Sequence, residues 1–346
     1  MSLLRVSSPH LTGPAKTSWV MQQVLLACIP GIAALTSFFG WGTLINIALA
    51  CLFALGFESL MLRIRKRPIA FYLGDYSALV TAVLLGIALP PLAPWWLVCV
   101  ATGFSIVIAK QLYGGLGYNP FNPAMVGYVV VLISFPVEMT RWAAPVNLVA
   151  GDALSFAEAV QTSLGLIDPT RLDAVTMATP LDVMRQNTSA MVEELWRGNA
   201  QFGTWGGIGW EWVNAGFLLG GAYLLARKIF SWHAPVGMLA ALALMAALFY
   251  DGGSSSSGGS PLFHLFSGAA MFGAFFIVTD PVTSATSTRG RLIYGALIGV
   301  LVYIIRTWGN YPDAVAFAVL LMNFAAPLLD HYTQPRTYGH ARGGKQ

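Results

Sequence analysis

Long apolar runs recur along nearly the whole chain, and they constrain its fold more than any other feature of the sequence. A helix needs about 20 mostly apolar residues to cross the hydrocarbon core of a bilayer. Ten runs meet or approach this length, and we predict that each forms a membrane span. The third and fifth runs are short or broken by proline, so they are expected to be half-helices. The runs cover residues 20–39, 41–62, 76–92, 95–113, 123–136, 210–229, 233–250, 262–279, 291–308 and 312–330.

The composition agrees with a membrane location. Only 10% of the residues are charged and the mean hydropathy is +0.65, whereas soluble domains are about one-quarter charged. Cys28, Cys51 and Cys99 lie in apolar runs without C-x-x-C spacing, which argues against a disulfide framework or an iron–sulfur cluster held by this chain. The five histidines form no metal-binding motif, so no metal site is expected. The predicted fold class is therefore an all-α integral membrane protein with about ten transmembrane helices.

Lysine and arginine gather in alternate loops, which predicts the direction of the spans. Cytoplasmic loops of membrane proteins carry an excess of these residues. A cytoplasmic N-terminus places nine of them on the inner side, and it leaves Arg306 as the exception near an outer end. The tail 331–346 then lies in the cytoplasm as well. The nine inner residues are Arg63, Arg65, Lys66, Arg67, Lys110, Arg227, Lys228, Arg289 and Arg291.

One long polar segment divides the predicted spans into two sets of five. Residues 1–136 are expected to form a first membrane repeat and residues 210–330 a second. Residues 137–209 between them form a loop domain outside the membrane, which is periplasmic in a Gram-negative cell. Its mixture of charged residues and brief apolar runs predicts an ordered cap with short helices.

The two halves resemble each other weakly. Ser77–Pro91 and Ser267–Pro281 are both apolar runs that begin with serine and end at a proline. Because each half has an odd number of spans, the second repeat must be inverted relative to the first. Inverted repeats with interrupted helices place binding sites near the middle of the membrane. Chance similarity between two helices rich in glycine and alanine is the alternative explanation.

The pattern D-x-x-T-x-A-T occurs twice, at residues 173–179 and 280–286. The two copies make Thr179 and Thr286 rivals for the same role if spacing is the only guide. The second copy ends an apolar span, so its hydroxyl groups are expected to cap the next helix. The first copy lies in the polar cap, where an exposed threonine could be modified from outside.

A second polar motif, Asn119-Pro-Phe-Asn122-Pro, follows a glycine-rich stretch on the predicted inner side. Prolines interrupt the helical hydrogen bonds here, and glycines allow the backbone to approach a ligand closely. Two asparagine amides offer both donors and acceptors, which suits the edge of a flavin or another heterocycle. A re-entrant turn whose asparagines only satisfy freed backbone groups is an equally good explanation.

Two acidic residues, Glu58 and Asp75, lie near the ends of apolar spans. Burying a charge in hydrocarbon is costly, so such residues need a partner or a function. Glu58 lies about one helical turn before Arg63, and we expect it to pair with that residue or to reach toward the membrane surface.

These strings give the chain a family resemblance that covers nearly its whole length. It resembles the D subunit of the Rnf electron-transport complex and, more distantly, the B subunit of sodium-pumping NADH:quinone reductase. Asp173-Ala-Val-Thr176-Met-Ala178-Thr179 looks like the flavinylation motif of that family. The resemblance implies that Thr179 carries FMN through a phosphoester bond, with Asp173, Thr176 and Ala178 as the surrounding motif. The alanine in the second motif position and the proline after Thr179 are minor departures.

The resemblance also implies a second, non-covalent flavin. Asn119 and Asn122 lie in a string similar to the one that is implicated in holding riboflavin in that family. Asp280 and Thr283, in Asp280-Pro-Val-Thr283, are family-like as well and are further candidates for this site. The cofactors implied are therefore covalent FMN and riboflavin.

The activity implied by the resemblance is electron passage between NAD(H) and ferredoxin, coupled to Na⁺ or H⁺ transport across a bacterial inner membrane. This chain has no G-x-G-x-x-G fingerprint and no cluster cysteines. Partner subunits are therefore expected to supply NADH binding, iron–sulfur clusters and another flavin, so the chain is not catalytic alone. A flavin transferase would attach the FMN, and no nucleic-acid partner is expected. A solute channel or secondary transporter of the same inverted-repeat architecture is the alternative function.

Overall fold

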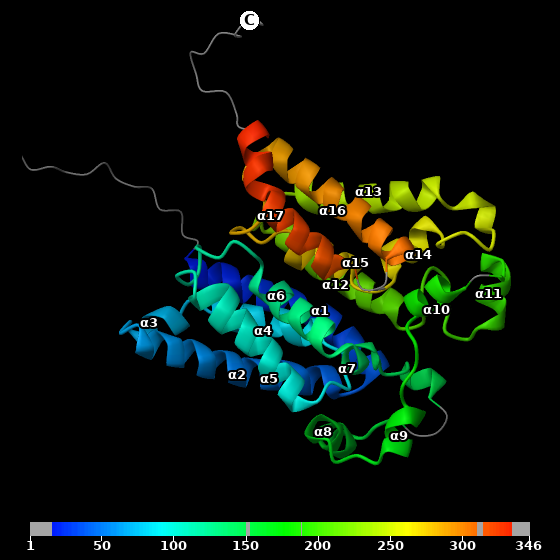
Figure 1. Cartoon of the computed structure of the whole chain (residues 1–346), viewed down its shortest axis with the longest axis horizontal. Helices are drawn as coiled ribbons and strands as arrows, with labels where there is room; N and C mark the ends of the chain where they lie inside the picture. The colour runs from blue at the N-terminus through cyan, green and yellow to red at the C-terminus, as the bar shows by residue number, and fades with distance from the viewer. Residues whose placement is uncertain (1–15, 150–152, 188, 310–313, 334–346) are drawn as a thin grey trace, which may run out of the picture.

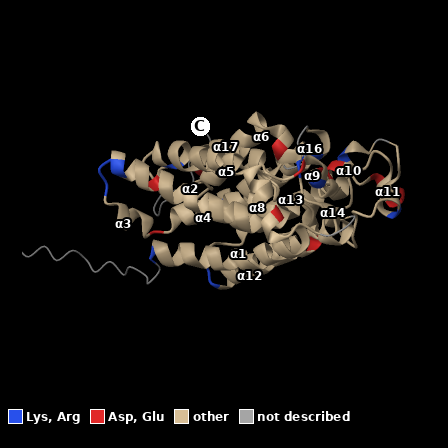
Figure 2. Cartoon of the chain, turned by 90° about the horizontal axis from the view of Figure 1, so that it is seen from below, with Lys and Arg blue, Asp and Glu red and all other residues tan. Residues whose placement is uncertain are grey.

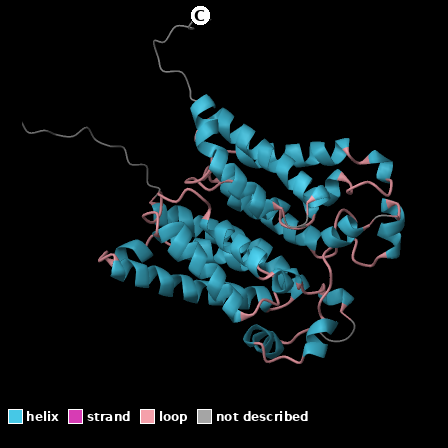
Figure 3. Ribbon diagram, viewed as in Figure 1, coloured by secondary structure: helices cyan, strands magenta, loops and turns pink. Residues whose placement is uncertain are grey.

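The computed structural model describes residues 16–149, 153–187, 189–309 and 314–333, and in these ranges the chain is built from helices (Figures 1 and 3). Each of the ten predicted runs contains helix, which confirms the all-α membrane class. Within the described ranges, four helices are long and apolar enough to cross a membrane by themselves, namely α1 (Thr17–Phe39), α2 (Gly42–Ile64), α16 (Thr288–Trp308) and α17 (Val315–Thr333). The remaining runs hold shorter elements: α4 (Ser77–Ala88), α5 (Trp95–Gly103), the π-helix η1 (Phe104–Gln111), α6 (Pro123–Ser134), α12 (Trp210–Ala226), α13 (His233–Leu248), α14 (Pro261–Phe266), α15 (Ala270–Phe272) and the π-helix η4 (Gly273–Ile277).

The third and fifth runs are short helices, as predicted. Helices α4 and α6 have 12 residues each, and 12 residues span only about 18 Å. The fourth run changes from α-helix to π-helix at Phe104, which the sequence pattern did not predict. The range 262–279 is also not one continuous helix, because the chain leaves helical geometry between Phe266 and Ala270.

The first helices of the two halves pack against each other in opposite directions. Gln23 near the start of α1 accepts a hydrogen bond from Tyr223 near the end of α12. Phe39 at the end of α1 contacts Trp210 at the start of α12, with ring centroids 5.0 Å apart. This antiparallel pairing is what a second repeat inverted relative to the first requires.

Glycines allow α1 and α12 to approach closely. A Cβ atom at Gly220 would collide with the carbonyl oxygen of Ala27, and one at Gly216 would lie 2.8 Å from the carbonyl oxygen of Pro30. Small residues at such contacts are typical of helices that associate within membranes, where close van der Waals packing replaces the hydrophobic effect.

Polar side chains satisfy the backbone where helices are broken. The amide of Asn46 in α2 donates to the carbonyl of Pro90 beyond the end of α4 (2.8 Å). The amide of Asn214 in α12 donates to the carbonyl of Gly268 (2.9 Å) and accepts from the backbone N–H of Met271 (3.0 Å). Both asparagines are buried, and an unsatisfied backbone group inside a membrane costs several kcal/mol. These two residues therefore stabilise the interrupted segments.

Arg306, the apparent exception to the charge rule, has a related role. Its guanidinium is buried and donates to the carbonyl oxygens of His264 (2.8 Å) and Ser267 (3.2 Å), which lie at the break in the eighth run. The residue contributes to internal structure, so its position near an outer end does not contradict the predicted orientation.

The described residues between 137 and 209 form short helices at one end of the bundle (Figure 1). Ser155 and Asp168 cap α8 and α9, and Ser155 forms a reciprocal capping box with Glu158. Hydrogen bonds from Ser155 lower the pKa of Glu158, and hydrogen bonds from Thr170 lower the pKa of Asp168.

We call the end of the bundle that carries these short helices the cap end. The opposite end, which carries residues 63–67, is the basic end (Figure 2). The helices of the segment are α7 (Pro136–Thr140), η2 (Val146–Leu148), α8 (Phe156–Leu164), α9 (Pro169–Ala174), α10 (Pro180–Gln186) and α11 (Val192–Gly198).

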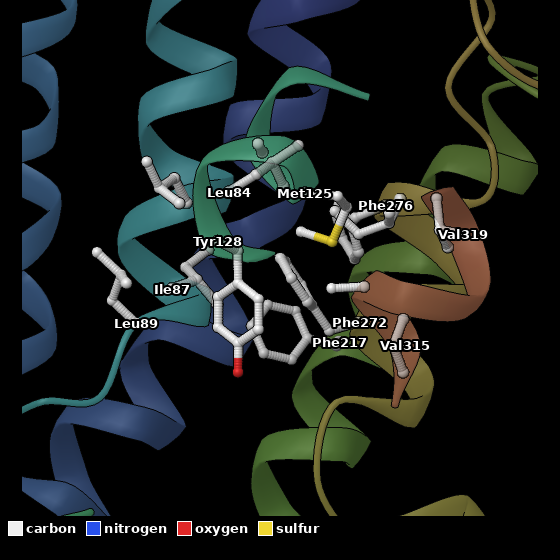
Figure 4. Close-up of a cluster of buried hydrophobic side chains, with 14 of the residues drawn as sticks. Leu84, Ile87, Leu89, Met125, Tyr128, Phe217, Phe272, Phe276, Val315 and Val319 are labelled. Atoms are coloured by element: carbon white, nitrogen blue, oxygen red, sulfur yellow. The ribbon is translucent and has the colours of Figure 1, made fainter. Parts of the chain in front are cut away.

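A buried apolar cluster joins the two halves between these ends (Figure 4). Tyr128 from α6 lies beside Phe217 from α12, and Phe217 contacts Phe272 and Phe276 with ring centroids 5.0 and 5.7 Å apart. The rings come from both halves of the chain, so the cluster fixes the halves relative to each other.

We predict that Gly220→Val destabilises the protein, because its side chain would push α12 away from α1. Overpacking a well-packed contact costs about 1–3 kcal/mol or more. Gly56→Val is the matched control, since Gly56 is exposed in α2 and a Cβ atom there meets nothing within 4 Å. Thermal unfolding of the detergent-solubilised protein should show a lowered Tm for Gly220→Val alone. Equal Tm values for the two variants would contradict the proposed helix contact.

Candidate functional site

In the described part of the chain, two cavities lie between the halves, one toward each end. The cap-end cavity is mostly apolar and has Thr179 at its rim, with Tyr128, Trp142, Trp210 and Phe217 among its lining residues. The basic-end cavity is larger, at about 460 Å³, and is lined by both polar and apolar side chains. Small-molecule sites typically occupy about 300–1,000 Å³, so the basic-end cavity is large enough for a ligand of this kind.

Thr179 is the N-cap residue of α10 and is partly exposed. Its hydroxyl group donates to the carboxylate of Asp182 (2.6 Å) and accepts from the backbone N–H of the same residue (3.2 Å). An ester at this hydroxyl would remove the donated proton and leave the oxygen as an acceptor. The backbone N–H of Asp182 could then still cap α10 through this oxygen.

The residues before Thr179 run along the chain that follows α7. The N–H of Ala144 donates to the carbonyl of Val175 (2.8 Å), and the N–H of Met177 donates to the carbonyl of Trp142 (3.0 Å). We call residues 173–179 the strap. Val175 is buried in the main apolar cluster, so it anchors the strap to the membrane helices. The strap gives Thr179 a defined position at the cavity rim.

The other motif residues have different exposures. Asp173 and Ala178 are exposed, whereas Thr176 is half-buried and its hydroxyl donates to the carbonyl of Asp173 (3.0 Å). These residues shape a turn on the surface and do not line the cap-end cavity.

Aromatic rings lie beside Thr179. Trp142 and Trp210 line the cap-end cavity, their ring centroids are 5.0 Å apart, and Phe39 lies at the same distance from Trp210. An isoalloxazine is a flat aromatic ring system, and offset or edge contacts with aromatic side chains stabilise such groups. The volume of this cavity is only about 80 Å³, which is below the usual range of small-molecule sites, so the cavity as it stands does not enclose a ring system of this size.

The rival residue, Thr286, lies at the basic end. It is exposed, and its backbone N–H donates to the carboxylate of Asp330 (2.8 Å). The neighbouring Ser287 accepts from the N–H of Gly290 and caps α16 (2.9 Å). The cap of the next helix is thus the residue directly after the motif, and not a hydroxyl of the motif itself. The two copies of the motif lie at opposite ends of the bundle.

The four predicted residues of the second site come together at the basic end. Asn119, Asn122 and Asp280 all line the basic-end cavity, and Thr283 is buried next to Asp280. The carboxylate of Asp280 accepts from the hydroxyl of Thr283 (2.9 Å) and from the amide of Asn122 (3.4 Å). Residues from the two halves of the chain thus form one polar wall.

The observed geometry agrees in part with each of the two explanations of the asparagine motif, ligand binding and a re-entrant turn. The side-chain oxygen of Asn122 caps α6 by accepting from the N–H of Met125 (3.3 Å), and the amide of Asn119 donates to the nearby carbonyl of Phe121 (3.1 Å). The same two side chains also line the cavity, so they can satisfy backbone groups and present polar atoms to a ligand. A heterocycle with donors and acceptors on one edge fits this donor set.

The prediction for Glu58 is wrong. Glu58 does not pair with Arg63; its carboxylate accepts from the ammonium group of Lys110 (3.0 Å) and from the amide of Gln111 (2.7 Å). Lys110, which was expected in an inner loop, is buried at the end of η1, and its ammonium group also donates to Ser77 (2.8 Å). The partners lie 52 and 53 positions away along the chain, so the spacing along one helix could not reveal them.

The sequence motifs do not reveal several residues that line the basic-end cavity with hydroxyl or basic groups. Among them are Ser77, which begins an apolar run, and Arg291, which the charge pattern places in a loop. Their placement depends on the antiparallel packing of the two halves. Among the described residues, no group of three or more histidine, cysteine, aspartate or glutamate side chains is arranged to hold a metal ion.

The fold and the two cavities together define an all-α integral membrane protein with a ligand-sized site between its halves. The chain belongs to the NQR2, RnfD, RnfE family, whose model matches residues 5–339. This result confirms the family resemblance.

The chain is also similar to relatives over nearly its full length. It is 60% identical to the D subunit of the ion-translocating oxidoreductase complex of Ectopseudomonas mendocina (strain ymp), covering 99% of this chain and 97% of that protein. It is 58% identical to the protein of the same name from Pseudomonas aeruginosa (strain UCBPP-PA14), with the same coverage. The protein of that name from Salmonella paratyphi A is 52% identical, covering 97% of this chain and 98% of the relative.

Proposed function

We propose that this chain is the flavin-carrying membrane subunit of an ion-translocating oxidoreductase complex. The coarse part of this conclusion follows from the relatives, which are named as D subunits of such complexes and match nearly the whole chain. The chain is thus one subunit of a multi-subunit translocase and is not catalytic alone. The family favours this role over a solute channel or secondary transporter, which the architecture by itself would also allow.

The finer proposal is that Thr179 carries a covalent FMN. The observation that supports it most directly is the position of Thr179, which is partly exposed and lines the cap-end cavity beside Trp142 and Trp210. Trp142 and Trp210 would orient the ring, and the strap formed by residues 173–179 would hold the tether at a fixed depth. A bound flavin would supply one-electron or two-electron transfer, while this chain supplies its position and surroundings.

A second, non-covalent riboflavin is proposed in the basic-end cavity. Asn119 and Asn122 would bind its pyrimidine edge, and Asp280, held by Thr283, would position the amide of Asn122. Two flavins at opposite ends of the helical bundle would place an electron-carrying group near each membrane surface. Phe217 and Phe272 line the cap-end cavity and Phe276 lines the basic-end cavity, so their packed rings separate the two cavities.

The proposed topology rests on the charge distribution. We propose that the basic end faces the cytoplasm with both termini and that the cap end faces the periplasm of a bacterial inner membrane. A flavin transferase acting on that side could then reach Thr179. Partner subunits would supply NADH binding, iron–sulfur clusters and another flavin, so that the complex passes electrons between NAD(H) and ferredoxin with Na⁺ or H⁺ transport.

We predict that Thr179→Asn abolishes covalent flavin. Asparagine keeps an N-cap acceptor for α10 but has no hydroxyl group to esterify, so the fold is retained. The measurement is flavin fluorescence on a denaturing gel, together with the mass of the tryptic peptide Leu172–Arg185. Thr286→Asn is the matched control and should leave the fluorescence unchanged. A band that stays fluorescent in Thr179→Asn and darkens in Thr286→Asn would show that the second copy of the motif carries the flavin.

We predict that Asn119→Ala and Asn122→Ser each lower the amount of non-covalent flavin that co-purifies with the protein. Serine at position 122 can still cap α6 but lacks the amide donor. The loss of one hydrogen bond is worth about 0.5–1.5 kcal/mol, which corresponds to a roughly twofold to tenfold weaker affinity. Riboflavin released by acid can be quantified by chromatography, while the covalent fluorescence serves as an internal control. Unchanged riboflavin content in both variants would place the ligand elsewhere.

A further inference from the structure

A buried ion pair borders the basic-end cavity and has no part in the function described above. Lys110 and Glu58 are 2% and 3% exposed, with the ammonium nitrogen 3.0 Å from the carboxylate oxygen. Removing two charges from water is expensive, and a buried pair is weak evidence for stability alone. Charges kept inside a membrane are by default candidates for function.

The geometry gives the two partners different positions relative to the cavity. Lys110 lines the cavity together with Ser77, whereas Glu58 does not line it. The ammonium group of Lys110 donates to Glu58 and to Ser77. An ammonium group has three donors, so one N–H remains for a ligand in the cavity. The positive member of the pair is therefore nearer to the ligand than the negative member.

The other charged groups of the cavity wall do not cancel this effect. Within the described ranges, Arg291 is the second cation that lines the cavity, and Asp280 is the acidic residue of its wall, where Asn122, Thr283 and the backbone N–H of Val282 donate to it. These charged lining side chains thus sum to an excess of one positive charge. Lys110 and Glu58 are buried, so dissolved ions screen their charges much less than they screen exposed charges.

We propose that Lys110, held by Glu58, is the charge-compensating cation for the reduced form of a flavin in the basic-end cavity. This inference rests on the proposed riboflavin at that site. Two electrons from the donor subunits of the complex and one proton convert an oxidised isoalloxazine into its reduced anion, whose negative charge lies on the N1–C2 side of the ring. Lys110 stabilises that anion relative to the neutral oxidised ring, and Glu58 limits the effect by attracting the ammonium group away from the ligand.

We predict that substitutions of the two members of the pair shift the midpoint potential of the bound riboflavin in opposite directions. Lys110→Met removes the cation and should make the midpoint potential of the bound riboflavin more negative. We expect the reduced form to lose at least tenfold in affinity relative to the oxidised form, which is about 30 mV for a two-electron couple. Glu58→Gln removes the carboxylate that attracts the ammonium group of Lys110 away from the ligand, so it should make the potential more positive. A purely structural role for the pair would not produce shifts of opposite sign.

The experiment uses the full-length chain purified from cells that lack the flavin transferase and supplied with riboflavin, so that the non-covalent flavin is its sole flavin. Anaerobic reduction with dithionite against a reference dye, followed by absorbance, gives the potential. Lys110→Arg should restore a value near that of the unmodified protein. Arg63→Met, which removes an exposed charge from α2, is the matched control and should leave the potential unchanged.

The double variant Lys110→Met/Glu58→Gln protects the test against misfolding, because it leaves no unpaired buried charge in place of this pair. Its potential should lie between that of Lys110→Met and that of the unmodified protein. Retained riboflavin with the same potential in Lys110→Met, Glu58→Gln and the double variant would overturn this inference alone. Failure of the unmodified chain to bind riboflavin would overturn the proposed flavin site as well.

Discussion

Hydrogen bonding of the backbone inside an apolar environment is the constraint on which the rest of this structure depends. Continuous helices satisfy it without help, but the third and eighth runs are interrupted where the cavities form. Asn46 and Asn214 supply the missing partners from neighbouring helices, and Arg306 supplies two further donors at the eighth run. Without these side chains, the freed carbonyl groups would lie unsatisfied within the membrane. The interruptions can therefore persist, and the space beside them becomes available to a ligand.

The interrupted segments also explain why the cavities lie at opposite ends. Residues at the start of α4 line the basic-end cavity, and residues at its end line the cap-end cavity. The eighth run has the reverse order, since Gly268 near its start lines the cap-end cavity and Thr279 at its end lines the basic-end cavity. Two antiparallel segments thus contribute to both sites. This reversed order agrees with the predicted inversion of the second repeat relative to the first.

Charge is distributed between the two sites in a way that fits different tasks. The lining side chains of the cap-end cavity are mostly apolar and aromatic, which suits the proposed covalent attachment at Thr179, because a tethered ring would need no further polar anchor. The basic-end cavity combines amides, hydroxyl groups and charged residues, as a ligand held only by non-covalent contacts requires. A buried pair such as Lys110 and Glu58 is tolerated there because Gln111 and Ser77 also bond to it.

The sequence by itself determined the helical membrane class, because apolar runs of bilayer length leave no other stable arrangement for the backbone. It also pointed to Thr179, Asn119 and Asn122 through local motifs that can be read within a few residues. Only the tertiary structure decided that Asn122 and Asp280 share one wall, that Glu58 pairs with Lys110 instead of Arg63, and that Thr179 caps α10. The first two of these facts depend on contacts between residues far apart in the chain. Packing of α1 against α12 through small residues brings the two halves together, and no local pattern records which helix faces which.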